Sequence, residues 1–296
     1  MPVSVVTDST SCLTAEEVAR HHLGVVALSV TLDDVTYVEG EDDAGFYAAF
    51  IQTRSFPTTS QPSVSAFVDA FTERIERGDE VVGVFISSDM SGTHSTALMA
   101  REMVLEAHPG ATIEIVDSRS NCMELGLAAL AAARAAEAGG SAAEAAAAAR
   151  EMTLHTRFLF VPDTLEYLRR GGRIGNASAL IGTLLQIRPI LTVVDGRTDV
   201  FAKVRTKHRA FIEIADAFER DVAAKGLGEV YVQHIADEPE GRELAELIAA
   251  KAGRPVSVLP IGPPIGAHVG PGSVGVVYST IKPMEKPKAS AMKVQA

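Results

Sequence analysis

Apolar residues along the first half of the chain follow two periodicities. Short runs rich in β-branched residues predict buried strands at Val3–Val6, at 80–87 (EVVGVFIS) and at 111–117 (ATIEIVD). The segments between these runs carry apolar residues at helical spacing, most clearly Val64, Phe67, Val68, Phe71 and Ile75. Strands that alternate with helices predict an α/β fold with a mostly parallel sheet.

The second half of the chain starts a new series of elements. A strand is predicted around Phe158 (FLFVP), and Asp195-Gly196 between two apolar runs is typical of a two-residue β-hairpin. A long helix at about 206–224 is followed by a strand, a helix and a further strand. This half is therefore also predicted to be α/β.

The length and the change of pattern predict two α/β domains. A chain of 296 residues is long enough for two cores, and we expect these at residues 1–156 and 157–283. The segment 284–296 is rich in Lys, Pro, Ala and Met without periodicity, and we expect it to be disordered.

The composition narrows the class of protein. A formal net charge of −11 argues against a broad nucleic-acid-binding surface, which needs a basic face. The start MPVSVVTDST lacks the basic region of a signal peptide, and no window has about 18 uninterrupted apolar residues. Cys12 and Cys122 are too few for a disulfide framework, which favours a reducing cytoplasm. The eight histidines are scattered without a metal-binding pattern, so no metal is expected.

Three polar loops follow predicted strands of the first half. They are TDSTS at 7–11, SSDMSGT at 87–93 and DSRSN at 117–121. Parallel sheets place ligands beyond the carboxyl ends of their strands. One polar loop would mean little, but three together indicate a ligand site at this edge.

Individual residues in these loops allow more than one interpretation. Asp8 could be a phosphotransfer nucleophile, but that chemistry favours a second acid where Thr10 stands, so a turn or capping role is preferred. Ser91 and its neighbours Gly92 and Thr93 begin a predicted helix, where backbone N–H groups attract an anion. Capping and turn formation explain the same residues, and Ser91 lacks the G-x-S-x-G elbow of a hydrolase.

Two further segments could contribute polar groups. FPTTSQPS at 56–63 precedes the helix that begins near Val64, with Pro62 at a position tolerated in a first helical turn. His268 lies in a glycine-rich loop that lets the backbone approach a ligand closely, although the glycines could serve only as turns. We expect the hydroxyl-rich segment to lie directly before a helix N-terminus.

Basic residues gather in two short segments despite the acidic background. One is YLRRGGRIG, with Arg169, Arg170 and Arg173, and the other is AKVRTKHR, which contains Lys203 and Arg205. Such runs are usually solvated surfaces. Against a net charge of −11 they are also candidates for meeting a carboxylate, a phosphate or an acidic partner.

The order of these motifs resembles that of the DegV family, the bacterial fatty-acid-binding subunits of a fatty acid kinase system. The matching segments are TDST, TTSQPS, SSDMSGTHSTA, VDS, YLRRGGRIG, RPIL and IGPPIGAHVGPGSVG, from about Val3 to Ile281. The resemblance implies a two-domain α/β protein that holds one long-chain, palmitate-like fatty acid between its domains. It implies no cofactor and no catalytic turnover.

The resemblance also implies which residues bind the acid. Thr59 and Ser91 match the hydroxyl residues that hydrogen-bond the fatty acid carboxyl group. His268 and Arg173 match positions of the surrounding network. Flanking residues are secondary candidates: Ser60, Gln61, Gly92, Thr93, Asp8 and Ser9.

The implied function is presentation of the bound acid to a separate ATP-dependent kinase that makes an acyl phosphate. Lys203 and Arg205 are the candidate docking residues for that kinase, and any membrane contact is transient and at the surface. Two alternatives remain: a small phosphatase or esterase that uses Asp8 or Ser91, and a lipid-responsive regulator with another partner.

Overall fold

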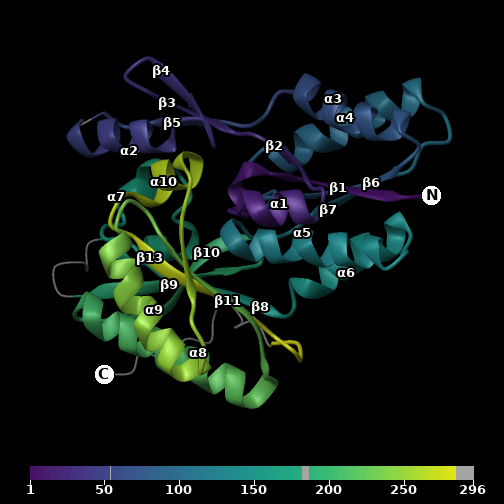
Figure 1. The fold of residues 1–296 in the computed structure, drawn as a ribbon. Helices are drawn as coiled ribbons and strands as arrows, with labels where there is room; N and C mark the ends of the chain where they lie inside the picture. Colours follow the sequence, from purple (N-terminus) through teal and green to yellow (C-terminus); the bar gives the residue numbers. More distant parts are fainter. Residues whose placement is uncertain (54, 182–186, 285–296) are drawn as a thin grey trace.

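A four-stranded parallel sheet forms the centre of the N-terminal half of the chain (Figure 1). The computed structural model describes residues 1–53, 55–181 and 187–284. The sheet has the order β2-β1-β6-β7, and every pairing is parallel. Its strands are β1 (Val3–Asp8), β2 (Gly24–Val26), β6 (Glu80–Phe85) and β7 (Ile113–Asp117). The predicted parallel α/β layer is confirmed.

Helices cover both faces of this sheet because its strands are apolar on both sides. Val6 and Phe85 pack with the helices α3 and α4, whereas Val5 and Val84 pack with α5 and α6. A capping box formed by Thr14 and Glu17 opens α1. The helices are α1 (Ala15–Arg20), α3 (Val64–Glu76), α4 (Thr93–Ala107), α5 (Cys122–Glu137) and α6 (Ala142–Met152). Strands that are apolar on both faces, like those of this sheet, are typical of parallel sheets covered by helices.

A small subdomain interrupts the N-terminal half between β2 and α3. It contains β3 (Ser29–Leu32), β4 (Val35–Val38), α2 (Asp43–Gln52) and β5 (Thr58–Ser60), and we call these elements the flap. The predicted loop at 56–63 was therefore wrong in part, because Thr58–Ser60 pairs antiparallel with β3. Pro62 also precedes the helix, since Ser63 is the N-cap of α3.

The C-terminal half forms a six-stranded mixed sheet of order β10-β9-β8-β13-β11-β12. Only the β11–β12 pairing is parallel. The predicted Asp195-Gly196 hairpin is confirmed between β9 and β10, with both residues at positive φ. The strands are β8 (Thr156–Val161), β9 (Arg188–Val194), β10 (Arg197–Val204), β11 (Leu227–His234), β12 (Ser257–Pro260) and β13 (Val274–Thr280).

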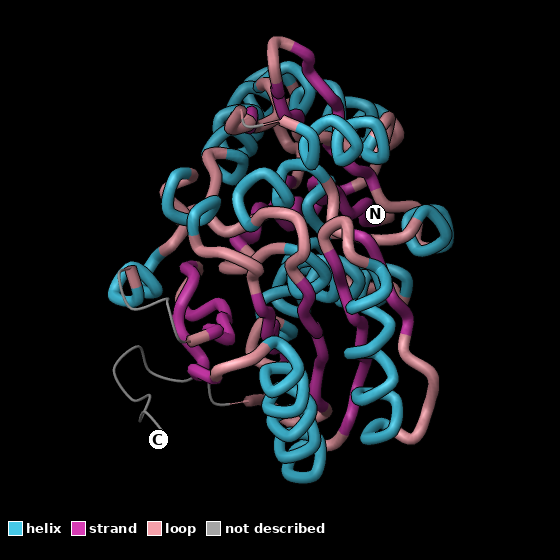
Figure 2. The backbone as a smooth tube through the Cα atoms, turned by 90° about the vertical axis from the view of Figure 1, so that its left-hand side faces the viewer, coloured by secondary structure: helices cyan, strands magenta, loops and turns pink. Residues whose placement is uncertain are grey.

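The two faces of this sheet have different partners, as Figures 1 and 2 show. Leu159 and Val161 pack with α8 (Lys207–Lys225) and α9 (Glu238–Ala252). Phe158 and Phe160 point to the opposite face and join the core that also contains α5. Because side chains alternate between the two faces along β8, one face of the sheet packs on the helices of its own half and the other packs on the N-terminal half.

Short elements and the chain end complete the fold. The short helices are η1 (Ser9–Ser11), α7 (Glu166–Arg170), η2 (Gly175–Leu180) and α10 (Pro263–Val269). Met284 is buried and its N–H bonds the Leu154 carbonyl, so the predicted disordered tail cannot begin there. Residues 285–296 lie outside the described part, and the domain boundary at 156/157 stays a prediction. No described helix has the length and hydrophobicity to span a bilayer.

Candidate functional site

A cavity lies between the two halves of the chain, beyond the carboxyl ends of β1 and β6. The N-terminal half contributes Ile86, Met90 and Ser91, and the flap contributes Thr59. The C-terminal half supplies most of the apolar wall, including Phe158, Phe160, Leu168, Val193, Ile235, Ile261 and Ile265.

The flap brings Thr59 to His268 across the cavity. Strand β5 pairs Thr59 with Val30 of β3, and His268 stands near the end of α10. The Thr59 Oγ1 and His268 Nε2 atoms are 2.9 Å apart. The imidazole lies so close to the chain at Gly171 that a Cβ there would be 2.3 Å from His268 Nδ1. Gly171 therefore has to lack a side chain for His268 to reach Thr59.

His268 is a neutral imidazole at physiological pH. Burial, reinforced by the positive charge of Arg173, lowers its pKa from 6.5 to about 4. Its Nδ1 atom is buried and has no hydrogen-bond partner among the residues that the structure describes. A buried N–H without an acceptor costs more than an unused lone pair on the same atom, so the proton belongs on Nε2. His268 then donates to Thr59 Oγ1, and the Thr59 hydroxyl proton is free to bond a ligand.

Arg173 connects this pair to the loop that carries Ser91. Its Nε donates to the Met90 carbonyl at 2.9 Å, and its Nη1 donates to the Gly171 carbonyl at 2.6 Å. Ser91 follows Met90, and its Oγ lies 2.8 Å from Thr93 Oγ1. All four primary candidates thus line one cavity, with Thr59 bonded to His268 and with Arg173 bonded to the backbone of the loop that carries Ser91.

The segment 56–63 contacts both halves of the chain. Phe56 stacks on Tyr167 of α7, with ring centroids 5.6 Å apart. Gln61 Nε2 donates to Thr96 Oγ1 of α4 at 2.6 Å, and a side chain at Gly92 would collide with Gln61. Phe56 and Gln61 therefore anchor the segment on both sides of Thr59.

The secondary candidates mostly have structural partners. Ser60, Gln61, Gly92 and Thr93 are not among the residues that line the cavity. The Ser9 hydroxyl accepts a bond from the Leu28 N–H. These contacts favour supporting roles for them.

Asp8 joins the ends of two neighbouring strands. Its carboxylate accepts bonds from the Thr10 N–H at 3.0 Å and the Ile86 N–H at 2.8 Å. It is buried, and desolvation raises its pKa to about 6. With its oxygens occupied in this way, Asp8 fits the capping role preferred from sequence rather than a nucleophile.

Some polar residues of the wall were missed by the sequence analysis. Thr10, Asn121, Thr198 and Ser273 also line the cavity. Thr10 and Asn121 belong to two of the three polar loops, so that signal could have found them. Thr198 and Ser273 come from the C-terminal half, and no motif placed them opposite these loops.

The basic docking candidates lie on the surface at the junction of β10 and α8. Lys203 and Arg205 are both exposed, and neither makes an ion pair with another described residue. Lys207, close by in sequence, instead donates to the Gly272 carbonyl.

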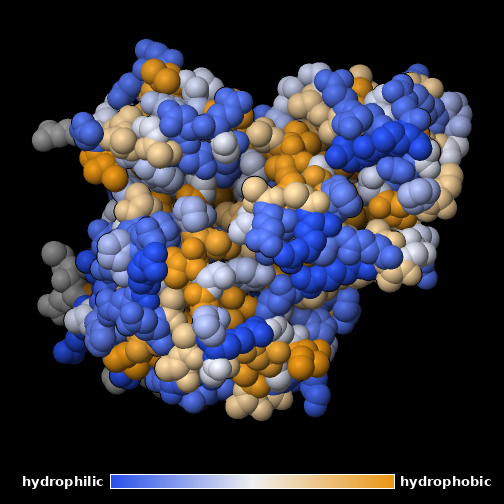
Figure 3. Space-filling model, viewed as in Figure 1, coloured by the Kyte–Doolittle hydropathy of each residue, from blue (hydrophilic) through white to orange (hydrophobic). Residues whose placement is uncertain are grey.

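Figure 3 shows apolar surface between polar areas where the upper and lower parts of the molecule meet.

A family model described as "Uncharacterised protein, DegV family" matches residues 2–280. The chain belongs to the DegV family. A DegV domain-containing protein of Clostridium acetobutylicum is 47% identical over 96% of this chain and 100% of its own length. This confirms the resemblance inferred from the motifs.

Solved structures of DegV proteins share the fold. A DegV family protein from Thermus thermophilus, described by its fatty acid binding, is 32% identical with a TM-score of 0.83, covering 95% of this chain and 100% of that one. A stearic acid-binding protein from Eubacterium ventriosum is 26% identical with a TM-score of 0.85, covering 94% and 98%. The DegV structural match therefore extends over both halves.

Proposed function

We propose that this protein binds one long-chain fatty acid, with the carboxylate between Thr59 and Ser91 and the chain along the apolar wall. The observation that carries the proposal is that Thr59, His268, Arg173 and Ser91 all line one largely apolar cavity, in which Thr59 and His268 are hydrogen-bonded to each other. The fatty acid binding described for the Thermus thermophilus and Eubacterium ventriosum proteins supports it.

The acyl chain supplies most of the affinity in this proposal. About 15 methylenes at roughly 0.8 kcal/mol each offer on the order of 12 kcal/mol before the costs of binding. Phe158 and Phe160 stack with their ring centroids 4.9 Å apart and form part of the surface that would receive the chain. The polar residues then mainly orient the acid.

The carboxylate is held by neutral donors. A buried carboxylate needs hydrogen bonds in place of water. The His268-to-Thr59 bond leaves the Thr59 hydroxyl proton for the ligand, and Ser91 supplies a second hydroxyl from the opposite loop. Arg173 already donates to two backbone carbonyls, so it acts chiefly through its positive charge. Hydroxyl donors leave the carboxylate more reactive toward a phosphate than a bidentate arginine would.

The protein presents this carboxylate to a separate kinase and has no turnover of its own. Ser91 pairs with Thr93 rather than with a base, and Asp8 is occupied by N–H groups, so the geometry gives the hydrolase alternative little support. Lys203 and Arg205 are exposed cations next to the β10 end, suited to an acidic surface of the kinase.

Organic extraction of freshly purified protein, followed by lipid mass spectrometry, tests the binding. We expect near-stoichiometric long-chain fatty acid. An empty protein that also shows no thermal shift with added palmitate would contradict the proposal.

Kinase docking is tested by Lys203→Gln with Arg205→Gln. We expect phosphorylation of bound palmitate by a fatty acid kinase subunit to fall while palmitate affinity stays unchanged. Arg242→Gln with Lys251→Gln, which removes two surface charges from α9, is the matched control. Equal loss of phosphorylation and affinity in the Lys203 and Arg205 variant would rule out docking there.

A further inference from the structure

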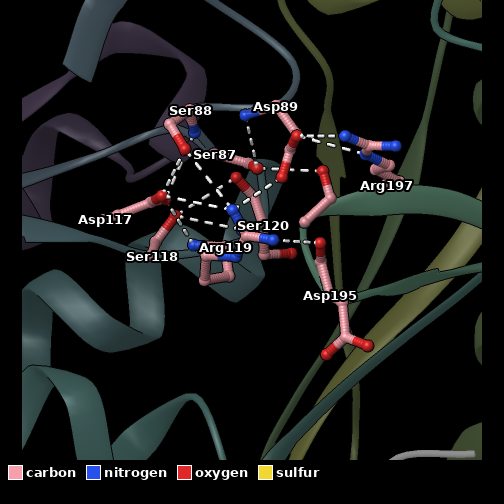
Figure 4. Close-up of polar contacts among 10 residues, drawn as sticks. Ser87, Ser88, Asp89, Asp117, Ser118, Arg119, Ser120, Asp195 and Arg197 are labelled. Carbon is pink, nitrogen blue, oxygen red and sulfur yellow. Dashed lines mark hydrogen bonds and ion pairs between the residues drawn. The ribbon is translucent and has the colours of Figure 1, made fainter. Parts of the chain in front are cut away.

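Three charged residues join the two halves of the chain beside the cavity (Figure 4). Asp89, in the loop after β6, receives one arginine on each carboxylate oxygen. Arg197 of β10 donates from Nη2 to Oδ1 at 2.7 Å, and Arg119, in the loop after β7, has its Nη1 2.6 Å from Oδ2. The two arginines lower the pKa of Asp89, so it is ionised at physiological pH. We call Asp89, Arg119 and Arg197 the clasp.

The β9–β10 hairpin docks against the same loops through its backbone. The Ser87 hydroxyl donates to the Gly196 carbonyl at 2.9 Å, and Arg119 donates to the Asp195 carbonyl. A Cβ at Gly196 would lie 2.5 Å from Ser87 Oγ, and the residue has a φ of +80°. The hairpin turn can therefore approach the loops this closely only with glycine at that position.

The clasp is next to cavity residues on both sides. Asp89 directly precedes Met90 and Ser91, which line the cavity, and the Met90 carbonyl holds Arg173. Arg197 directly precedes Thr198, which lines it from the other half. A shift of the hairpin away from Asp89 would thus separate two walls of the cavity.

We propose that the clasp positions the Met90–Ser91 loop against the C-terminal half and sets the rate at which the bound acid leaves the cavity. The inference rests on the proposed function. Asp89 is a positioning residue, because it acts through its two neighbours. The ion pairs of the clasp are partly exposed, with 66% of the Arg197 side chain accessible. They can therefore open without unfolding a core, and salt weakens them, so the clasp is suited to limiting the release of the bound acid.

Release of a prebound fluorescent long-chain fatty acid into excess phosphatidylcholine vesicles, followed by stopped flow, measures this rate. We expect Arg197→Gln to accelerate release about threefold and Asp89→Asn, which weakens both pairs, about tenfold. Release from the unaltered protein should accelerate as sodium chloride is raised, and this dependence should largely disappear in Arg197→Gln. Arg197→Lys should restore most of the slow release.

Arg209→Gln is the matched control, because Arg209 is exposed on the same half and has no ion pair with a described residue. Its release rate should equal that of the unaltered protein. The proposed role of the clasp would be overturned if Arg197→Gln released the acid within 1.5-fold of the rate of the unaltered protein and with the same salt dependence. Because Arg197 is exposed, this variant should stay folded even if Asp89→Asn unfolds. An unaltered protein that retains no fluorescent acid would instead overturn the proposed function.

Discussion

Besides the core that α5 shares with β8, two junctions between the halves of the chain have opposite character. At the flap, Phe46, Phe50 and Ala267 of α10 are buried in one apolar cluster. At the clasp, Asp89 and Arg197 meet as charged groups at the surface. Burial of aromatic side chains stabilises by several kcal/mol, whereas exposed ion pairs contribute about 0–1 kcal/mol. The flap junction is therefore the stronger of the two, and the clasp can open at a smaller cost in free energy.

The flap junction also holds the ligand-facing pair in register. The Tyr47 hydroxyl donates to the Ile261 carbonyl at 2.6 Å and the Gly262 carbonyl at 3.0 Å, at the start of α10. His268 stands at the other end of the same short helix. Thr59 and His268 are thus aligned by packing and hydrogen bonds that do not depend on salt.

Phe46→Ala should break the flap junction with the largest effect. Phe46 is fully buried and contacts Tyr37, Tyr47 and Phe50 in edge or tilted geometry. We expect the free energy of unfolding, measured in urea, to fall by about 3–5 kcal/mol. Ile51→Ala on the same helix is the control, because Ile51 is exposed and should change it by no more than about 0.5 kcal/mol. Equal decreases in the free energy of unfolding of the two variants would show that the flap junction is not the stronger one.

Glu39→Gln should alter the pH dependence of the same junction. Glu39 is packed beneath Gly262, and desolvation raises its pKa from 4.5 to about 8. A carboxyl group whose pKa is raised by folding stabilises the folded state most when it is protonated. For Glu39 this contribution is fully present below pH 4.5 and is lost as the pH rises through about 8.

The unaltered protein should therefore lose stability between pH 5 and pH 8.5 relative to Glu39→Gln, as urea unfolding at several pH values would measure. Glu41→Gln, at an exposed neighbouring position, should follow the unaltered protein. Parallel stability curves for Glu39→Gln and the unaltered protein would show that Glu39 is ionised in the folded state.

The sequence predicts the helices and strands far better than the contacts between segments that are distant in the chain. The parallel layer and the Asp195-Gly196 hairpin follow from local periodicity and turn chemistry, which act over a few residues. The strand at Thr58–Ser60 has no such signal, because three residues between prolines become a strand only by pairing with β3. That pairing joins residues far apart in the sequence, such as Val30 and Thr59, which no local pattern shows.

The same limit applies to the candidate site. Thr59, Ser91, His268 and Arg173 were proposed through the family resemblance, and the structure places all four on one cavity. Nothing in the sequence indicates the clasp, although its loops SSDMSGT and DSRSN are polar segments at predicted strand ends. Arg197 lies 108 residues from Asp89, and no local pattern could show that they meet.

Thr59→Val should separate the polar link at the flap junction from its packing. Valine keeps the shape of threonine but removes the hydroxyl that connects His268 to the proposed carboxylate. Loss of a hydrogen bond to a charged group costs about 1.5–3 kcal/mol, so we expect palmitate affinity, measured by displacement of a fluorescent fatty acid, to fall at least tenfold. Urea stability without lipid should fall by no more than about 1–3 kcal/mol, the cost of leaving the His268 Nε2–H without its acceptor. Thr58→Val is the matched control, because Thr58 is exposed on the same strand and does not line the cavity. Unchanged affinity in Thr59→Val would place the carboxylate elsewhere and leave the flap junction a purely structural contact.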